Sequence, residues 1–131
     1  MTAFEGDTGP YLQYAHARLC SIHRKTAPLL PSTYPASADL SLLTEPHAID
    51  LIRVLSQYPD VVANTIKTQE PTTILTYLFK MSHVLSSSYD HLRIVGSEEK
   101  LMEARMALYD SARGVLGSGM RLLGLSPVER M

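Results

Sequence analysis

Hydrophobic residues recur every three or four positions along most of the chain, which is the spacing of an α-helix. The first such stretch runs from Pro10 to Lys25. Its apolar arc consists of Leu12, Ala15, Leu19 and Ile22. A neighbouring stripe on the same helix is aromatic and basic, and it consists of Tyr11, Tyr14, Arg18 and Lys25. The pattern predicts a helix with one buried face and an unusual second face beside it.

Four more helices follow from the same spacing. They are predicted over about 45–57 with Thr44 as the cap, around 61–66, over 72–89, and from a Ser97 cap to about Gly124. Val61 and Val62 locally favour a strand, but the four-residue recurrence fits a helix better. A leading loop over 1–9 and an extended, proline-rich surface connection over 27–44 complete the chain.

These elements predict an all-α helical bundle that forms a single domain over residues 1–131. No strand-length alternation and no internal repeat is visible in the sequence. The apolar fraction of 45% and the charged fraction of 19% are those of an ordinary globular domain, so the chain is expected to fold rather than stay disordered.

Charge and cysteine content narrow the class of protein. Twelve basic residues against 13 acidic ones give a net charge of −1, which neither supports nor excludes a nucleic-acid partner. Cys20 is the single cysteine and cannot form an intrachain disulfide. The first residues lack a secretory signal and no apolar run could span a bilayer, so we expect an intracellular protein without membrane contact.

No catalytic or metal-binding motif stands out. The five histidines include no pair four residues apart, so they are expected to be solvated or singly hydrogen-bonded. The glycine-enriched stretch 114–124 lacks the lysine of a phosphate-binding loop and is better explained by close helix packing. Arg105 falls on an apolar helix face, where it needs a structural ion pair or, as a second option, a ligand contact.

The aromatic stripe has two interpretations. Tyr11 and Tyr14 could be half-buried packing residues with solvated hydroxyls. Alternatively, their rings could stack on unpaired nucleobases while Arg18 and Lys25 meet phosphate. The residues alone leave both open.

The surrounding sequence favours the second interpretation. Residues 4–19, FEGDTGPYLQYAHARL, and the terminal stretch 122–131, LLGLSPVERM, closely resemble the two ends of the C-terminal anticodon-binding (DALR) domain of arginyl-tRNA synthetases. The segments 70–78 and 87–89 fit the same family, so the resemblance covers nearly the whole chain. It is strongest to the eukaryotic, fungal-like form.

The resemblance implies that the bundle binds the anticodon stem-loop of tRNA(Arg). The residues that it assigns to this contact are Glu5, Gly6, Asp7 and Thr8 in the leading loop, Tyr11, Tyr14 and Arg18 on the first helix, Tyr89, and Met131. A cytosine in the anticodon needs an acceptor for its exocyclic amine. A backbone carbonyl near the last helix or the carboxylate of Met131 could supply one if the tail packs against the first helix.

The resemblance also sets expectations for the parent enzyme. A synthetase of this family uses ATP and arginine in a Rossmann-type catalytic domain, which this chain lacks, so the 131 residues alone should bind no cofactor and catalyse nothing. A cytoplasmic enzyme is expected, with a mitochondrial parent as the other option. The alternative function is a helical protein-interaction module that self-associates or docks on a synthetase catalytic core.

Overall fold

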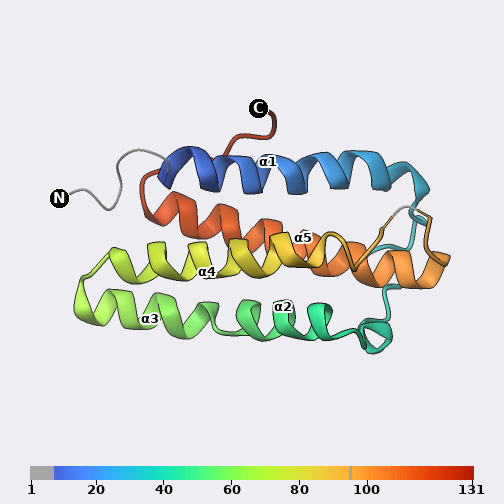
Figure 1. Ribbon diagram of the computed structural model, residues 1–131, viewed down its shortest axis with the longest axis horizontal. Helices are drawn as coiled ribbons and strands as arrows, with labels where there is room; N and C mark the ends of the chain where they lie inside the picture. The colour runs from blue at the N-terminus through green and yellow to red at the C-terminus, as the bar shows by residue number, and fades with distance from the viewer. Residues whose placement is uncertain (1–7, 95) are drawn as a thin grey trace.

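The computed structural model describes residues 8–94 and 96–131, and these form the expected all-α bundle without a strand (Figure 1). The helices are α1 (Thr8–Thr26), α2 (Pro46–Ser56), α3 (Tyr58–Thr68), α4 (Thr72–Ser88) and α5 (Glu99–Leu122). Two short 3₁₀ turns, η1 (Ala27–Leu29) and η2 (Leu40–Leu42), lie between α1 and α2.

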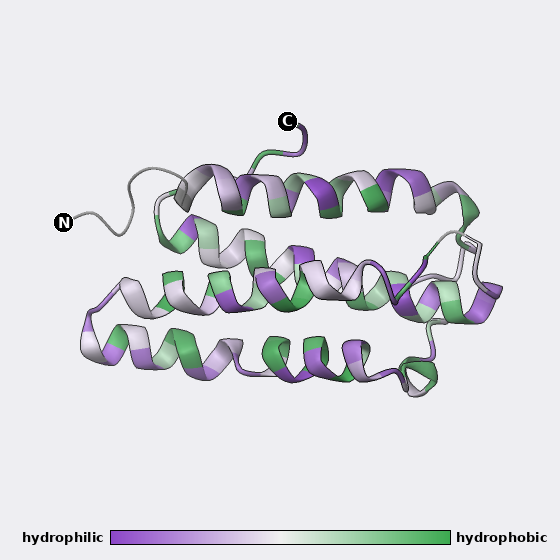
Figure 2. Ribbon diagram, viewed as in Figure 1, coloured by the Kyte–Doolittle hydropathy of each residue, from purple (hydrophilic) through white to green (hydrophobic). Residues whose placement is uncertain are grey.

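The helices pack side by side, both with neighbours in the sequence and with distant ones. Helix α1 packs along α5, and α4 packs against α2, α3 and α5 (Figure 1). Apolar side chains along the helices supply the core (Figure 2). Five of its fully buried members are Leu12, Leu51, Leu78, Met106 and Leu116. This arrangement leaves the opposite side of α1 open, so that the predicted aromatic stripe can reach the surface.

Helix boundaries follow the turn-forming residues closely. Pro59 lies in the first turn of α3, where a missing N–H costs nothing, and the helix expected around Val61 and Val62 is confirmed. Gly124 ends α5 with a positive φ of 82°, while Leu125 N–H donates to the Met120 carbonyl at 2.9 Å. Glycine reaches this left-handed conformation without strain, and the predicted end of the last helix is confirmed.

The predicted N-caps and the start of α1 are wrong. Glu45, not Thr44, precedes α2 without a side-chain capping bond, because its carboxylate is engaged by Arg105. Glu98 precedes α5, because the Ser97 hydroxyl donates to the Ile94 carbonyl at 2.7 Å instead. The leading loop ends earlier than residue 9, since α1 begins at Thr8 and its first turn accommodates proline.

The connection over 27–44 is more folded than the expected extended segment. The Tyr34 hydroxyl donates to the Asp110 carboxylate, which also contacts His23 Nδ1 at 2.9 Å. The Ser37 hydroxyl donates to Glu103 Oε2 at 2.7 Å. Both carboxylates belong to α5, so polar side chains of the connection tie it to the bundle, which hydrophobic spacing could not reveal.

Arg105 forms the predicted structural ion pair. Its guanidinium donates to the Glu45 carboxylate and, at 2.7 Å, to the carbonyl oxygen of Arg93. Burial of Glu45 opposes its ionisation, but the hydrogen bond and charge of Arg105, together with main-chain hydrogen bonds at Thr44 and Glu45, outweigh burial and lower the pKa of the carboxyl group. One α5 side chain thereby fixes both the start of α2 and the segment after α4.

Candidate functional site

The aromatic stripe of α1 reaches the surface mainly through Tyr14. Its side chain is 63% exposed, and Arg18, one helical turn later, is exposed as well. Tyr11 is half-buried, because its ring packs against Phe79 at 5.4 Å and His83 at 6.1 Å between centroids. Tyr14 therefore offers a free ring, while Tyr11 serves largely as packing between α1 and α4.

Arg18 is held in place by Tyr89, the residue that follows α4. The guanidinium carbon lies 3.8 Å from the centre of the Tyr89 ring, a cation–π contact. The ring of Tyr89 in turn packs against that of Tyr109, with the centroids 5.6 Å apart. Burial raises the pKa of Tyr89 well above its usual range, against the opposing effect of Arg18, so the phenol stays neutral.

The C-terminal tail, residues 125–131, crosses α1 beside this stripe. Gln13 makes two bonds to it, donating to the Ser126 carbonyl at 2.8 Å and accepting from Val128 N–H at 2.8 Å. His16 Nδ1 donates to the Val128 carbonyl at 2.8 Å, and Arg24 donates to the Glu129 carbonyl at 3.1 Å. These side chains fix the main chain of the tail, which brings the end of the chain next to α1.

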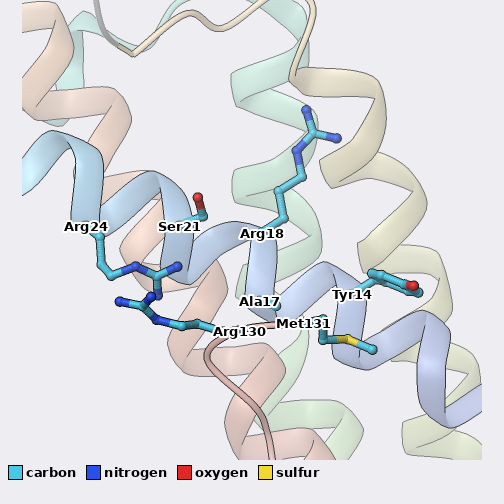
Figure 3. Close-up of a pocket in the computed structure, with 7 residues that line it drawn as sticks. All are labelled: Tyr14, Ala17, Arg18, Ser21, Arg24, Arg130 and Met131. Atoms are coloured by element: carbon cyan, nitrogen blue, oxygen red, sulfur yellow. The ribbon is translucent and has the colours of Figure 1, made fainter.

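A groove of about 560 Å³ lies between α1 and the tail (Figure 3). It is lined by Tyr14, Ala17, Arg18, Ser21, Arg24, Arg130 and Met131. Figure 3 shows Met131 at the Tyr14 end of the groove and the guanidinium groups of Arg24 and Arg130 pointing toward one another at the other end. We call this space the tail groove.

A smaller hollow of about 130 Å³ adjoins the tail groove between α1 and the end of α4. Its lining residues are Tyr11, Tyr14, Ala15, Arg18, Leu85, Ser86 and Tyr89. Tyr14 and Arg18 belong to both spaces, so the two form one surface with an exposed aromatic ring and Arg18 at their shared wall and two further guanidinium groups at the far end of the tail groove. We call this second space the tyrosine hollow.

The charge of the tail groove favours anionic ligands. Arg18, Arg24 and Arg130 line it, and no aspartate or glutamate side chain is among its lining residues. Guanidinium groups match phosphate geometry and stack on flat rings. An aromatic platform with three such groups can hold an unpaired base and the phosphates next to it.

The structure brings five of the sequence-predicted site residues together: Tyr11, Tyr14, Arg18, Tyr89 and Met131. Thr8 is the first residue of α1 rather than part of a loop. Glu5, Gly6 and Asp7 lie outside the described residues.

Sequence reasoning missed the residues that hold the tail. Gln13, His16 and Arg24 share a polar face of α1 on the other flank of the apolar arc from the aromatic stripe, a spacing that could have pointed to a third functional face. The histidines are predicted to be solvated or singly hydrogen-bonded, but His16 is buried, bonds the Val128 carbonyl and also contacts Cys20 Sγ at 3.6 Å. Arg130 was seen only as part of a terminal motif, and its place beside Arg24 depends on the tail's path.

Two other kinds of site find no support in the described part of the chain. Residues 8–94 and 96–131 hold no cluster of three His, Cys, Asp or Glu side chains that could bind a metal ion. Within the same ranges, none of the helices has the length and apolarity that crossing a bilayer requires.

Comparison with known proteins gives a consistent result. The family model described as "DALR anticodon binding domain" matches residues 12–131. The cytoplasmic arginine–tRNA ligase of Saccharomyces cerevisiae is 60% identical over the whole chain, and the mitochondrial one of the same yeast is 47% identical. The arginyl-tRNA synthetase of Thermus thermophilus superposes with a TM-score of 0.84 at 32% identity, over 98% of this chain and 22% of that one. The chain spans only 21% of the cytoplasmic yeast relative.

Proposed function

Since this chain belongs to the DALR anticodon-binding domain family, we propose that its bundle binds the anticodon stem-loop of tRNA(Arg). The observation that carries the proposal is the meeting of Tyr14, Arg18 and Met131 around one groove, from two ends of the chain. An exposed tyrosine on a single helix is common and says little by itself. Here, however, the tail that Gln13 and His16 hold in place borders the ring, so the parts of the site are positioned relative to one another.

The chemistry of the site suits single-stranded RNA. Bases splayed out of an anticodon loop need flat apolar surfaces, and each base stacked on an aromatic ring gains about 1–3 kcal/mol. Tyr14 supplies the free ring, and Tyr89 holds Arg18 where its guanidinium can meet a base plane or a phosphate. Arg24 and Arg130 add positive charge for the backbone on the far side of the groove.

The tail supplies acceptors for base edges. A cytosine amine needs a carbonyl or carboxylate oxygen, and Arg130 and Met131, at the end of the tail, line the tail groove. Because Gln13, His16 and Arg24 fix the preceding carbonyls, these oxygens are positioned before RNA arrives. We assign cytosine recognition to this end of the tail.

We further propose that the chain works as part of an ATP-dependent arginine–tRNA ligase. The support is its 60% identity to a fifth of the yeast enzyme. ATP and arginine would bind outside these 131 residues, which by themselves are expected to catalyse nothing. A cytoplasmic location fits the two yeast cytoplasmic relatives, at 60% and 53% identity, better than the mitochondrial one at 47%.

A matched pair of Tyr14 variants tests the proposal. Tyr14→Phe keeps the ring and should bind a tRNA(Arg) anticodon stem-loop like the unchanged chain. Tyr14→Ala removes the ring and should raise Kd by about 5- to 100-fold, the loss of one stacked base. Tyr14 is exposed, so both variants should unfold at the same urea concentration as the unchanged chain. Equal binding by all three proteins would remove Tyr14 from the function.

The alternative function, docking on a synthetase catalytic core, is supported by a separate feature. Ile66 and Leu122 are 72% and 56% exposed and border an apolar hollow of about 210 Å³ between α3, α4 and the end of α5. Large exposed aliphatic side chains around a hollow are typical of interfaces. The occupant we propose is the remainder of a full-length ligase, because relatives of this chain are about five times longer.

Hydrogen exchange separates this docking from self-association. In a full-length ligase containing this chain, amides of 62–74 and 122–123 should exchange more slowly than in the 131-residue chain. Equal exchange in the two proteins would contradict docking at this hollow. Concentration-dependent protection in the 131-residue chain alone would instead indicate that a second copy occupies it.

A further inference from the structure

A further hollow lies farther along α1 and adjoins the site described above through Arg18 and Tyr89. It has a volume of about 210 Å³ and forms where the C-terminal half of α1 meets the segment that follows α4. Arg18, Lys25 and Arg93 line it together with the buried rings and aliphatic side chains of the core. We call it the basic hollow.

The basic hollow carries positive charge without a counter-ion. No aspartate or glutamate lines it, and among the described residues none of its three cations takes part in an ion pair. Lys25 offsets the negative end of the α1 dipole, but Arg18 and Arg93 are left in excess. Three like charges facing one cavity repel one another, so an anion bound there would relieve this repulsion.

Two hydroxyl groups of the same hollow lack partners. Thr26 and Tyr89 both line it, and the Thr26 side chain is completely buried. Neither Thr26 Oγ1 nor the Tyr89 hydroxyl has a hydrogen-bond partner among the described residues. Buried hydroxyls are normally satisfied, and each unmade bond costs free energy. Both oxygens are shielded from solvent, so a ligand with acceptor oxygens would satisfy them only if the side chains around the hollow shift.

The position of the basic hollow indicates which anion it binds. Arg18 and Tyr89 line both this hollow and the tyrosine hollow, so the two spaces share a wall. We propose that the basic hollow binds a backbone phosphate of the RNA strand whose bases stack in the tyrosine hollow. This inference rests on the proposed function. Arg18, Lys25 and Arg93 supply the positive charge that binds a phosphate, a contact that is independent of the base sequence.

Charge-removing variants test this inference. The double variant Lys25→Gln/Arg93→Gln should bind the stem-loop about 3- to 30-fold more weakly, by the same factor for cognate and altered anticodon sequences. The slope of log K against log salt concentration should become shallower by about 0.7–0.9 for each phosphate that the variant no longer neutralises. The control is Arg53→Gln/Lys67→Gln on α2 and α3, on the opposite side of the bundle from α1 (Figure 1). Affinity and slope equal to those of the control would overturn the proposal.

A backbone modification identifies the source of the phosphate. Replacing single phosphates of the stem-loop by uncharged methylphosphonates should weaken binding to the unchanged chain at one or two positions. At those positions the double variant should show no further loss. If the losses caused by the double variant and by the methylphosphonates are additive at every position, the hollow does not bind RNA. The same conclusion follows if inorganic phosphate shifts the amide resonances of Lys25 and Arg93 and RNA does not displace it. If the unchanged chain binds no stem-loop at all, the proposed function itself is wrong. If the unchanged chain binds the stem-loop but the double variant binds it equally well, only the phosphate site is wrong.

Discussion

The guanidinium carbon of Arg18 lies 3.8 Å from the centre of the Tyr89 ring, so a residue in the middle of α1 is oriented by the residue that follows α4. The two side chains are 71 positions apart in the sequence. Both line the tyrosine hollow and the basic hollow. The contact therefore couples the packing of α1 on α4 to the charge of the surface that we assign to RNA.

Replacing Arg18 should damage RNA binding more than folding. Arg18→Gln removes the cation–π interaction and one positive charge, and the Kd for the stem-loop should rise about 5- to 30-fold. Arg18→Lys retains the charge without the planar group, so its Kd should lie between those of the unchanged chain and Arg18→Gln. Because Arg18 is exposed, the free energy of unfolding in urea should change by less than about 1 kcal/mol. A large loss of stability with unchanged binding would assign Arg18 a structural role only.

Releasing the tail should weaken RNA binding without unfolding the bundle. Gln13→Ala removes the bonds to the Ser126 carbonyl and to Val128 N–H. Each bond contributes about 0.5–1.5 kcal/mol to holding the tail, so Kd should rise about 2- to 10-fold. Gln13→Glu keeps the acceptor for Val128 N–H and should be less affected. Unchanged Kd in Gln13→Ala would show that the position of the tail does not matter to binding.

Two glycines of α5 should respond in opposite directions to the same substitution. A Cβ at Gly119 would lie 2.7 Å from Cδ2 of the fully buried Leu78, so Gly119→Ala should lower the free energy of unfolding by about 1–3 kcal/mol. A Cβ at Gly114 meets nothing within 4 Å, and Gly114→Ala should raise it by about 0.5–1 kcal/mol. Urea denaturation measures both. Similar effects at the two positions would contradict the close approach of α5 to α4.

The ion pair between Arg105 and Glu45 should make the free energy of unfolding depend on pH. Burial raises the pKa of the Glu45 carboxyl group in the folded state, but the hydrogen bond and charge of Arg105 and the main-chain hydrogen bonds at Thr44 and Glu45 together lower it overall. Because the pKa of Glu45 is lower in the folded state than in the unfolded one, its ionised carboxylate stabilises the fold at pH values above the ordinary glutamate pKa of 4.5. This contribution is lost as the pH falls through the lowered pKa of the folded state.

Glu45→Gln isolates this effect. At pH 7 the variant should be less stable by about 1–3 kcal/mol, because Arg105 is left buried without a charged partner. The difference should shrink as the pH is lowered from about 5 toward 3, which urea titrations at several pH values would detect. A difference that is constant with pH would show that the charge of Glu45 does not contribute.

Hydrophobic spacing predicted α1, α2, α4 and α5 because each has buried residues along one face, whereas α3 has none that is fully buried. Leu12 and Leu19 are buried as their arc on α1 requires. Val61 and Val62 are helical although both are only partly buried, because the strand preference of β-branched residues is weak and Val61 packs against the core. Gly124 ends α5 through local backbone geometry that the sequence itself encodes. These features depend on neighbours a few residues away.

The parts that sequence reasoning missed depend on contacts between distant residues. Thr44 and Ser97 have the right chemistry for caps, but neither caps the helix that follows it, and Glu45 before α2 is engaged by Arg105. The folded connection depends on Asp110 and Glu103 of α5, and the tail groove on Gln13 and His16. In the site, the resemblance supplied Tyr89 and Met131, whereas periodicity alone pointed only to the stripe on α1.

Mapping the RNA-binding surface by NMR tests the central claim most directly. An unlabelled tRNA(Arg) anticodon stem-loop is titrated into the ¹⁵N-labelled chain, and the amide resonances that shift are assigned. The account predicts that the shifts cluster in 11–25, 85–94 and 126–131 and leave 46–68 unchanged. Shifts confined to α2 and α3, or no shifts at RNA concentrations that saturate binding, would contradict it.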